Sequence, residues 1–168
     1  SASKASSDLI ALSFYKTYGM DIRVTRCCNN FGIGQHVEKL LPKSILSAIN
    51  DKEISIYGDG KNVREWIHAE DHAEGIILVS EKGKSGEVYN IGSGEEISNN
   101  EIAKMIARYT GTSAEIKYIT DRPGHDYRYA LNFNKIKQLG FCAKRSINDQ
   151  KEWNEIIEFY KKHRKTQT

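Results

Sequence analysis

Strand-like and helix-like segments alternate along most of the chain, with short glycine-containing links between them. In residues 21–28, Ile22 and Val24 alternate with charged residues, a pattern typical of a half-buried strand. In residues 99–110 the apolar residues recur at helical spacing, and Gly111 follows as a helix end. This alternation, without internal repeats, is typical of layered α/β proteins. The sequence therefore predicts an α/β fold.

The same patterns predict where the individual elements lie. Helices are expected at 4–18, 40–49, 70–82, 99–110, 131–140 and 146–162, and strands at 21–28, 53–57, 63–69, 86–91 and 114–119. Residues 29–35 are rich in Asn and Gly, which predicts a loop.

Length and composition limit the class of protein. The 168 residues, 39% of them hydrophobic, allow one core or two small ones. No run approaches the roughly 20 apolar residues of a membrane span, and no secretion signal is evident, so a cytoplasmic protein is expected. The net charge of +3 owes much to the tail 161–165, which we interpret as solvated. We expect neither membrane nor nucleic acid as a partner.

The cysteines and histidines do not form a recognisable metal site. Cys27, Cys28 and Cys142 have neither disulfide-framework nor zinc-ligand spacing, so they are interpreted as reduced core residues. His68 and His72 are four residues apart and would share one face of a helix. However, His68 belongs to a predicted strand, and a helix beginning between the two would point them in different directions. We expect no metal.

The first helix is apolar on two sides. Leu9 and Leu12 lie on one side, whereas Ile10, Phe14 and Tyr18 lie on the other at four-residue spacing. Such a helix must be covered both by its own domain and by something else.

Two glycine clusters follow predicted strands, at 57–60 and 91–94. Neither completes the G-x-G-x-x-G pattern that cradles a dinucleotide pyrophosphate ahead of a helix. If the protein uses a nicotinamide cofactor, we expect the part that grips the pyrophosphate to lie outside this sequence.

The stretch 121–130, DRPGHDYRYA, is the most informative about ligands. Pro123 and Gly124 favour a turn, around which Arg122, His125 and Arg128 supply donors suited to phosphate oxygens. The alternative is a surface turn with internal ion pairs. Arg64 also has two interpretations. It is either a second residue that binds a diphosphate, or a charge on an edge strand that discourages pairing with another sheet.

Aromatic and amide side chains leave further alternatives open. One of Tyr57, Trp66 and Tyr89 could stack on a base or sugar, although aromatic residues in strands more often pack in the core. The amides could bond sugar hydroxyls, but Asn is also common in turns. They are Asn29, Asn30, Asn90, Asn99 and Asn100.

Taken in order, several stretches resemble the C-terminal half of the dTDP-glucose 4,6-dehydratases, a family of extended short-chain dehydrogenases/reductases. They are SASKASSD, CNNFG followed by EKLLP, IYGDGKNVREWIHAEDHA, YNIGSGEE and DRPGHDYRYAL. The resemblance implies the C-terminal part of a Rossmann-type enzyme with a smaller mixed α/β substrate-binding domain. It assigns 1–80 to the remainder of the NAD-binding domain, with interwoven substrate-binding segments, and 81–168 to the nucleotide-sugar-binding domain. The two-sided first helix would pack against its mate in a homodimer.

The resemblance also implies roles for particular residues. Lys4 matches the lysine of the family's Tyr-x-x-x-Lys motif and is expected to be catalytic and to bind NAD, with the tyrosine just before Ser1. Asn30 is expected near the nicotinamide. The expected contacts to the nucleotide sugar, dTDP-glucose, are Asn29, Lys39, Leu40, Ser55, Ile56, Tyr57, Arg64, Asn99, Arg122 and His125.

The implied reaction is an NAD-dependent loss of water that converts dTDP-glucose to dTDP-4-keto-6-deoxyglucose. Because only Lys4 of the catalytic groups is present, we expect the chain alone to be inactive. Four departures from the family's pattern, at Cys28, Ile33, Ser55 and Tyr127, leave thymidine or uridine open. The alternatives are a UDP-sugar epimerase or decarboxylase of the same family, and a standalone nucleotide-sugar-binding module.

Overall fold

A computed structural model describes residues 2–163, so the end of the basic tail lies outside the described residues. The predicted α/β class is confirmed. In chain order the elements are α1 (Ala2–Tyr18), β1 (Val24–Cys27), β2 (Asn29–Phe31), α2 (Leu40–Ile49), β3 (Ile54–Tyr57), β4 (Val63–His68), α3 (Ala69–Lys82), β5 (Val88–Ile91), β6 (Glu95–Ser98), α4 (Asn99–Thr110), β7 (Ile116–Ile119), β8 (Arg128–Tyr129), α5 (Asn134–Lys137) and α6 (Gln150–Lys162).

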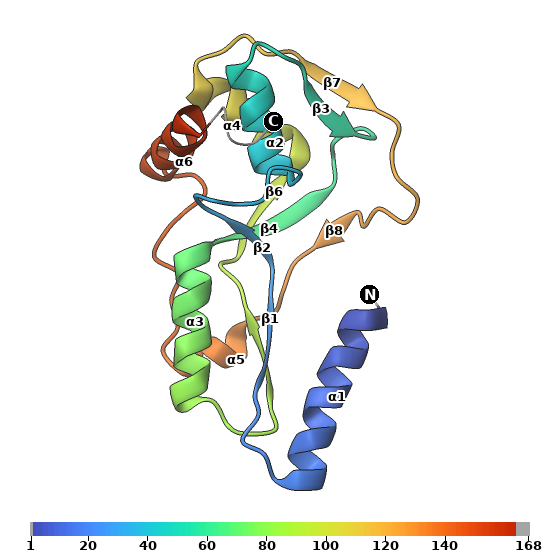
Figure 1. Cartoon of the computed structure of the whole chain (residues 1–168), viewed down its shortest axis with the longest axis vertical. Helices are drawn as coiled ribbons and strands as arrows, with labels where there is room; N and C mark the ends of the chain where they lie inside the picture. Colours follow the sequence, from blue (N-terminus) through green and yellow to red (C-terminus); the bar gives the residue numbers. More distant parts are fainter. Residues whose placement is uncertain (1, 164–168) are drawn as a thin grey trace.

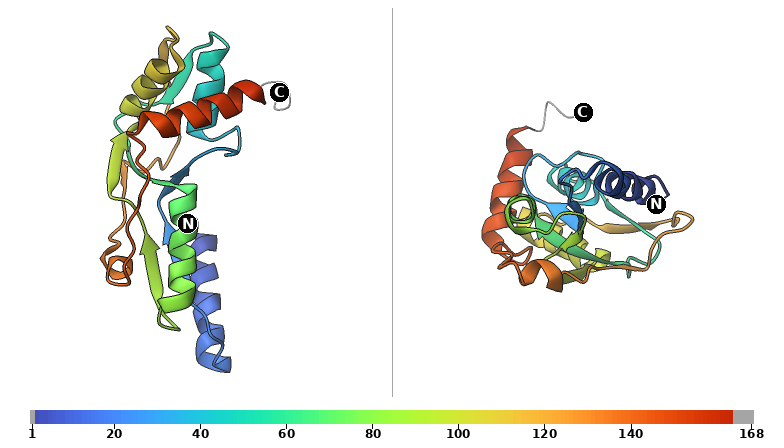
Figure 2. Two further views of the ribbon diagram at one scale, coloured as in Figure 1. Left: turned by 90° about the vertical axis from the view of Figure 1, so that its left-hand side faces the viewer. Right: turned by 90° about the horizontal axis from the view of Figure 1, so that it is seen from below.

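The molecule is elongated, with two halves joined by β2 and β4 (Figures 1 and 2). The half that contains the C-terminal helix groups α2, α4 and α6 with the parallel pair β3–β7. The other half contains the parallel pair β1–β5, with α3 on one side and α1 on the other (Figure 1). Between them runs the sheet β2-β4-β6, in which β8 also pairs with β4.

Strand β4 divides two hydrophobic cores because its side chains alternate between faces. Trp66 packs into the larger core, which is built around α2, α4 and α6. The next residue, Ile67, packs into the smaller core with Val79 and Ile91. Both cores draw residues from before and after residue 80, so the two predicted segments are interleaved in space.

Helix α4 shows how local sequence sets the limits of an element. Ser98 and Glu101 form a reciprocal capping box at its start. Gly111, with φ of +68°, ends it in a left-handed conformation that favours glycine. Between these ends, Ile102 and Ile106 are fully buried against the larger core.

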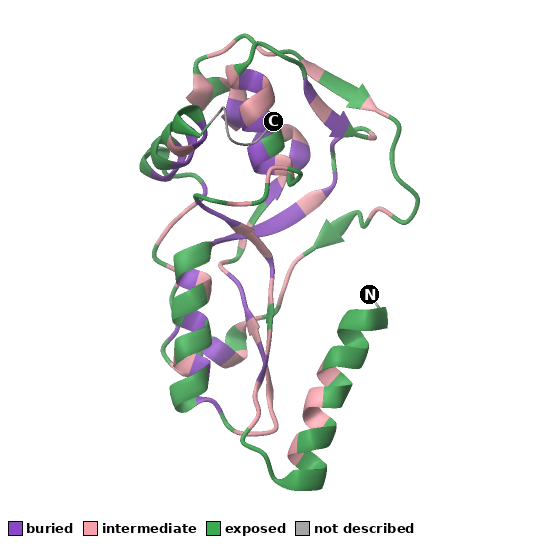
Figure 3. Cartoon of the chain, viewed as in Figure 1, coloured by how far each residue is buried: buried purple, intermediate pink, exposed green. Residues whose placement is uncertain are grey.

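Helix α1 has no buried residue (Figure 3). Asp8 holds it to β1 through an ion pair with Arg26, at 2.6 Å, and Tyr15 packs over Gly86. Leu9 and Ile10 are 69% and 59% exposed, so both predicted apolar sides are largely uncovered.

The structure differs from the predicted elements where pairing is long-range. Residues 29–31 form a strand, not a loop, because they pair in parallel with Trp66 to His68 of β4. Strands β6 and β8 were not predicted, and both exist by pairing with β4. The helix predicted over 131–140 spans only Asn134–Lys137. For the three strands, a partner distant in the sequence decides the conformation.

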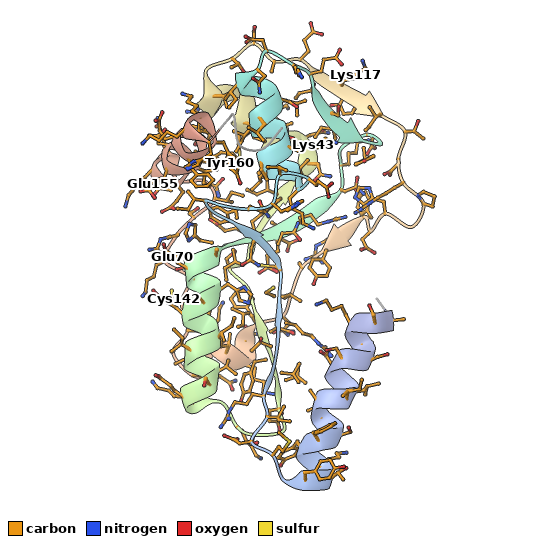
Figure 4. The ribbon with its side chains drawn as sticks, viewed as in Figure 1. Lys43, Glu70, Lys117, Cys142, Glu155 and Tyr160 are labelled. Carbon is orange, nitrogen blue, oxygen red and sulfur yellow. The ribbon has the colours of Figure 1, made fainter. Side chains whose placement is uncertain are left out.

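The cysteines occupy three different environments. Cys28 is buried at 4% exposure, Cys27 is half-buried, and Cys142 is exposed near α3 (Figure 4). All three are free, as predicted, but only Cys28 belongs to a hydrophobic core. The prediction of a core position is wrong for Cys27, which is half-buried outside both cores, and for Cys142, which lies in the irregular segment after α5.

We expect these environments to control thiol reactivity. Burial raises the pKa of the Cys28 thiol to about 12, so at pH 8 it stays protonated and a poor nucleophile. Site-resolved mass spectrometry after brief iodoacetamide treatment should find Cys142 alkylated and Cys28 intact, with Cys28 labelled only after denaturation. Equal labelling of both in the native protein would contradict the buried position of Cys28.

Candidate functional site

One pocket of about 600 Å³ lies where β2, β4 and the start of α2 meet the segment that follows β7. It is lined by Asn29, Asn30, Gln35, Glu38, Lys39, Leu40, Lys43, Ser44, Ser55, Tyr57, Arg64, Trp66, Asn99, Ile119, Arg122, His125, Asp126 and Tyr129.

The floor of the pocket comes from β2 and β4. Arg64 and Trp66 are two residues apart on β4, so both side chains reach the same face of the strand. Parallel pairing places Asn29 of β2 opposite Trp66. The position of β4 between β2 and β6 excludes the alternative that Arg64 protects a sheet edge.

Asn30 lines the pocket, but its amide is already engaged within the protein. Its Nδ2 donates to the Cys28 carbonyl at 3.2 Å, and its Oδ1 lies 2.9 Å from Nδ1 of His72, which donates to it. Burial lowers the pKa of His72, so the imidazole is neutral at pH 7. These bonds fix the orientation of Asn30.

Basic side chains predominate along the wall. Lys39 and Lys43 lie at the beginning of α2, where Figure 4 shows Lys43. Neither lysine has an ion-pair partner within residues 2–163. Lys39 occupies the N-cap position of α2, but its side chain makes no capping hydrogen bond. Backbone N–H groups in the first turn of α2 are therefore available to an anion. The acidic lining residues are Glu38 and Asp126. This wall is suited to a phosphate group.

The 121–126 turn completes the basic wall with Arg122, whose guanidinium has no ion-pair partner in the described part of the chain. Beside it, Nδ1 of His125 lies 2.7 Å from Asp121, and this hydrogen bond is the main cause of a lowered Asp121 pKa. Gly124, with φ of +69°, makes the reversal. The turn therefore presents Arg122 to the pocket with its cation available.

Strand β4 anchors this turn. Arg64 donates to the Asp126 carbonyl at 2.7 Å, and Glu65 accepts from the Leu131 backbone at 2.7 Å and from that of Gly94 at 2.9 Å. Arg64 also donates to the Val63 carbonyl at 2.7 Å, and its remaining N–H groups can bond a ligand. Arg128 was predicted to join this group, but its guanidinium instead makes a bidentate pair with Glu96, at 2.6 and 2.7 Å, outside the pocket.

The lip of the pocket is formed by Tyr57 and Ile119. They are paired with each other at the carboxyl ends of β3 and β7. The Tyr57 side chain is 42% exposed, so it offers an aromatic surface to a flat ligand group. Of the other aromatic candidates, Tyr89 is buried in the smaller core and is therefore a packing residue.

The structure brings most of the predicted site residues together around this pocket. They are Asn29, Asn30, Lys39, Leu40, Ser55, Tyr57, Arg64, Asn99, Arg122 and His125. Two predicted residues lie elsewhere: the Ile56 side chain is 1% exposed in the larger core because it points to the opposite face of β3, and Lys4 lies on exposed α1.

Sequence reasoning missed several lining residues. They are Gln35, Glu38, Lys43, Ser44, Ile119, Asp126 and Tyr129; Trp66 was named only as one of three aromatic alternatives. Lys43 and Ser44 lie one turn beyond Lys39 and Leu40 on the same helix face, and this periodicity could have found them. No local signal points to Gln35.

His68 and His72 do not form a metal site. His68 ends β4 and caps α3, where its Nε2 lies 3.4 Å from Glu152, whereas His72 turns to Asn30. Among the described residues there is no group of histidine, cysteine and acidic side chains able to hold a metal ion. The helix start at Ala69 separates the two rings, as predicted.

Comparison with known proteins shows the family of the chain. The model of the NAD dependent epimerase/dehydratase family matches residues 1–92. The chain belongs to this family. It is 43% identical over 166 residues to a dTDP-glucose 4,6-dehydratase of Streptomyces griseus, covering 98% of this chain and 50% of the relative. It is 47% identical to the low-salt glycan biosynthesis protein Agl12 of Haloferax volcanii, covering 89% of this chain and 48% of that protein.

Solved members of the family have the same fold. The dehydratase DesIV of Streptomyces venezuelae, crystallised with NAD bound, superposes with a TM-score of 0.92 at 41% identity over 98% of this chain and 51% of DesIV. A UDP-glucose 4-epimerase of Thermotoga maritima superposes with a TM-score of 0.88 at 27% identity over 95% of this chain and 52% of the epimerase. This chain thus spans about half the length of its relatives.

Proposed function

We propose that this chain supplies the nucleotide-sugar-binding part of an NAD-dependent dTDP-glucose 4,6-dehydratase. The observation that carries the proposal is one pocket in which Lys39, Lys43 and Arg122 are available to a diphosphate, with Tyr57 and Ile119 at its lip for a base. The similarity to dehydratases over nearly the whole chain supports the choice of dTDP-glucose.

Within such an enzyme, we assign 1–80 to the NAD-binding domain with interwoven substrate-binding segments, and 81–168 to the nucleotide-sugar-binding domain. Lys4 fits a role toward NAD because its ammonium has no ion-pair partner in residues 2–163 and remains free to bind a ribose hydroxyl. Asn30, held by His72, would lie beside the nicotinamide. NAD would supply hydride acceptance and return. A cytoplasmic location agrees with the free cysteines.

The experiment is calorimetric titration of the purified chain with dTDP-glucose and UDP-glucose. We expect binding of dTDP-glucose without formation of a 4-keto product, since the lining groups described above bind and orient rather than transfer protons. Preference for UDP-glucose would favour the epimerase alternative, which the similarity to the Thermotoga epimerase supports. Binding of neither nucleotide sugar would contradict the proposal.

We also propose that the chain forms a homodimer through α1. Leu9, Ile10 and Phe14 are 69%, 59% and 44% exposed, and an apolar helix surface of this kind favours association. None of the helices in residues 2–163 is long and apolar enough to cross a membrane.

Sedimentation should therefore give twice the chain mass of 19.1 kDa for the unmodified chain. Leu9→Asp should shift the equilibrium to monomer, because association would bury a charge. Ile77→Asp on α3, which alters a side chain of 56% exposure, serves as the matched control and should remain dimeric. A monomeric unmodified chain would contradict the proposal.

A further inference from the structure

The buried face of α6 ends in a tyrosine whose hydroxyl bonds outside the helix. Trp153, Ile156, Ile157 and Tyr160 follow one another at helical spacing, and all four are buried in the larger core. Tyr160, labelled in Figure 4, is 0% exposed, and its hydroxyl donates to the backbone carbonyl of Gln35 at 2.7 Å. Burial raises the pKa of Tyr160, so the hydroxyl is protonated and able to donate at pH 7. The end of α6 is therefore fixed to the 32–39 loop, which joins β2 to α2.

The 32–39 loop contributes to the pocket but belongs to no helix or strand. Gln35, Glu38 and Lys39 line the pocket. The loop begins with Gly32 and Gly34, whose φ angles are +145° and +75°. Glycine has access to many backbone conformations, so local sequence does not fix the path of such a loop. Bonds to other parts of the chain are needed to hold it.

Gln35 is held from two sides. Its Nε2 donates to the Asn30 carbonyl of β2 at 3.0 Å, and its own carbonyl accepts from Tyr160. From Gln35 the chain reaches Lys39 through a turn in which the Lys39 N–H donates to the His36 carbonyl at 3.0 Å. The position of Gln35 therefore influences that of Lys39 and of the first turn of α2, which are the groups available to a phosphate.

We propose that Tyr160 is a positioning residue for diphosphate binding, because through Gln35 it holds the 32–39 loop where Lys39 lines the pocket. This inference rests on the proposed function. It assigns a part in ligand affinity to α6, a helix that contributes no residue to the pocket lining.

The test measures the affinities of Tyr160→Phe for dTDP-glucose and dTDP by calorimetry. The substitution removes the hydroxyl and keeps the ring that packs in the core. Both affinities should fall about three- to tenfold and by the same factor, because both ligands carry the diphosphate. Hydrogen exchange should become faster in residues 35–39. Unchanged affinities in the folded variant would overturn the proposal.

A double-mutant cycle separates positioning from a general loss of stability. Lys39→Ala should weaken dTDP-glucose binding in the unmodified chain and weaken it less in Tyr160→Phe, because the lysine is already displaced there. Equal losses in the two backgrounds would show that Tyr160 does not act through the loop end that carries Lys39, and would overturn the proposal.

Tyr89→Phe is the matched control. Tyr89 is 3% exposed in the smaller core, outside the pocket lining, and its hydroxyl accepts from the Lys84 backbone N–H at 2.8 Å. The substitution should lower the free energy of unfolding about as much as Tyr160→Phe, and leave both affinities and the exchange of residues 35–39 unchanged. An equal loss of affinity in Tyr89→Phe would attribute the effect to stability and overturn the proposal.

Gly34→Ala keeps the proposal testable if Tyr160→Phe does not fold. Alanine at Gly34 meets no atom within 4 Å, but it strains the backbone at a φ of +75°, so the loop should shift and both affinities should fall. Unchanged affinities in this variant would show that the loop position does not govern binding, and would overturn the positioning role alone. Binding of neither ligand by the unmodified chain would overturn the proposed function as well.

Discussion

Replacing Arg122 by alanine is expected to weaken dTDP-glucose binding by about 2 kcal/mol, close to a thirtyfold rise in the dissociation constant. Arg122 lines the pocket and has no ion-pair partner within residues 2–163, so its guanidinium is available to the ligand's diphosphate. Because it is exposed and carries no structural bond from its side chain, its loss should leave the free energy of unfolding nearly unchanged. Calorimetric titration and urea unfolding measure the two effects separately.

Arg108→Ala is the control for this charge change. Arg108 is exposed on α4, where it lies over the Tyr109 ring and outside the pocket. Its removal lowers the net charge by the same amount and should not alter the affinity. If Arg122→Ala binds dTDP-glucose like the unmodified chain, Arg122 has no part in the site.

Glu65→Ala should give the largest loss of stability, on the order of 3 kcal/mol in the free energy of unfolding. The Glu65 carboxylate is 1% exposed and accepts from the backbone N–H groups of Gly94 and Leu131. Alanine would remove the acceptor of both N–H groups and leave a small cavity in place of the buried carboxylate. The chain after the 121–126 turn would also lose an anchor, so dTDP-glucose binding should weaken as well.

The control lies directly across the sheet. Glu96 on β6 faces Glu65 on β4 in the antiparallel register, but it pairs with Arg128 at the surface. Water can replace that partner, so Glu96→Ala should change the urea midpoint little. Equal effects of the two substitutions would show that the buried bonds of Glu65 do not hold the segment after β8.

Much of the candidate site could be predicted because its residues sit in local sequence patterns. The turn that presents Arg122 follows from Pro123 and Gly124, whose backbone preferences act within a few residues. Lys39 and Leu40 precede a run with helical periodicity, so the sequence also predicts their place at a helix start. Whether any of these residues faced a ligand did not follow from those patterns.

The rest depended on pairing between distant segments. Residues 29–31 have the composition of a loop, and they form a strand only because β4 offers its backbone groups. The same strand turns Trp66 toward the pocket and Glu65 away from it, a choice that a shift by one residue would reverse. Arg128 lies in the informative stretch, yet β6 supplies the carboxylate that takes it out of the site.

The sequence by itself determined the α/β class, the ends of helices such as α4, and the turn that carries Arg122, because capping, periodicity and turn preferences are local interactions. The tertiary structure alone decided that these pieces share one pocket and that Arg128 bonds Glu96 outside it. The physical reason is that hydrogen-bond satisfaction depends on all the neighbours of an atom, and β-sheet pairing sets those neighbours across long separations in the chain.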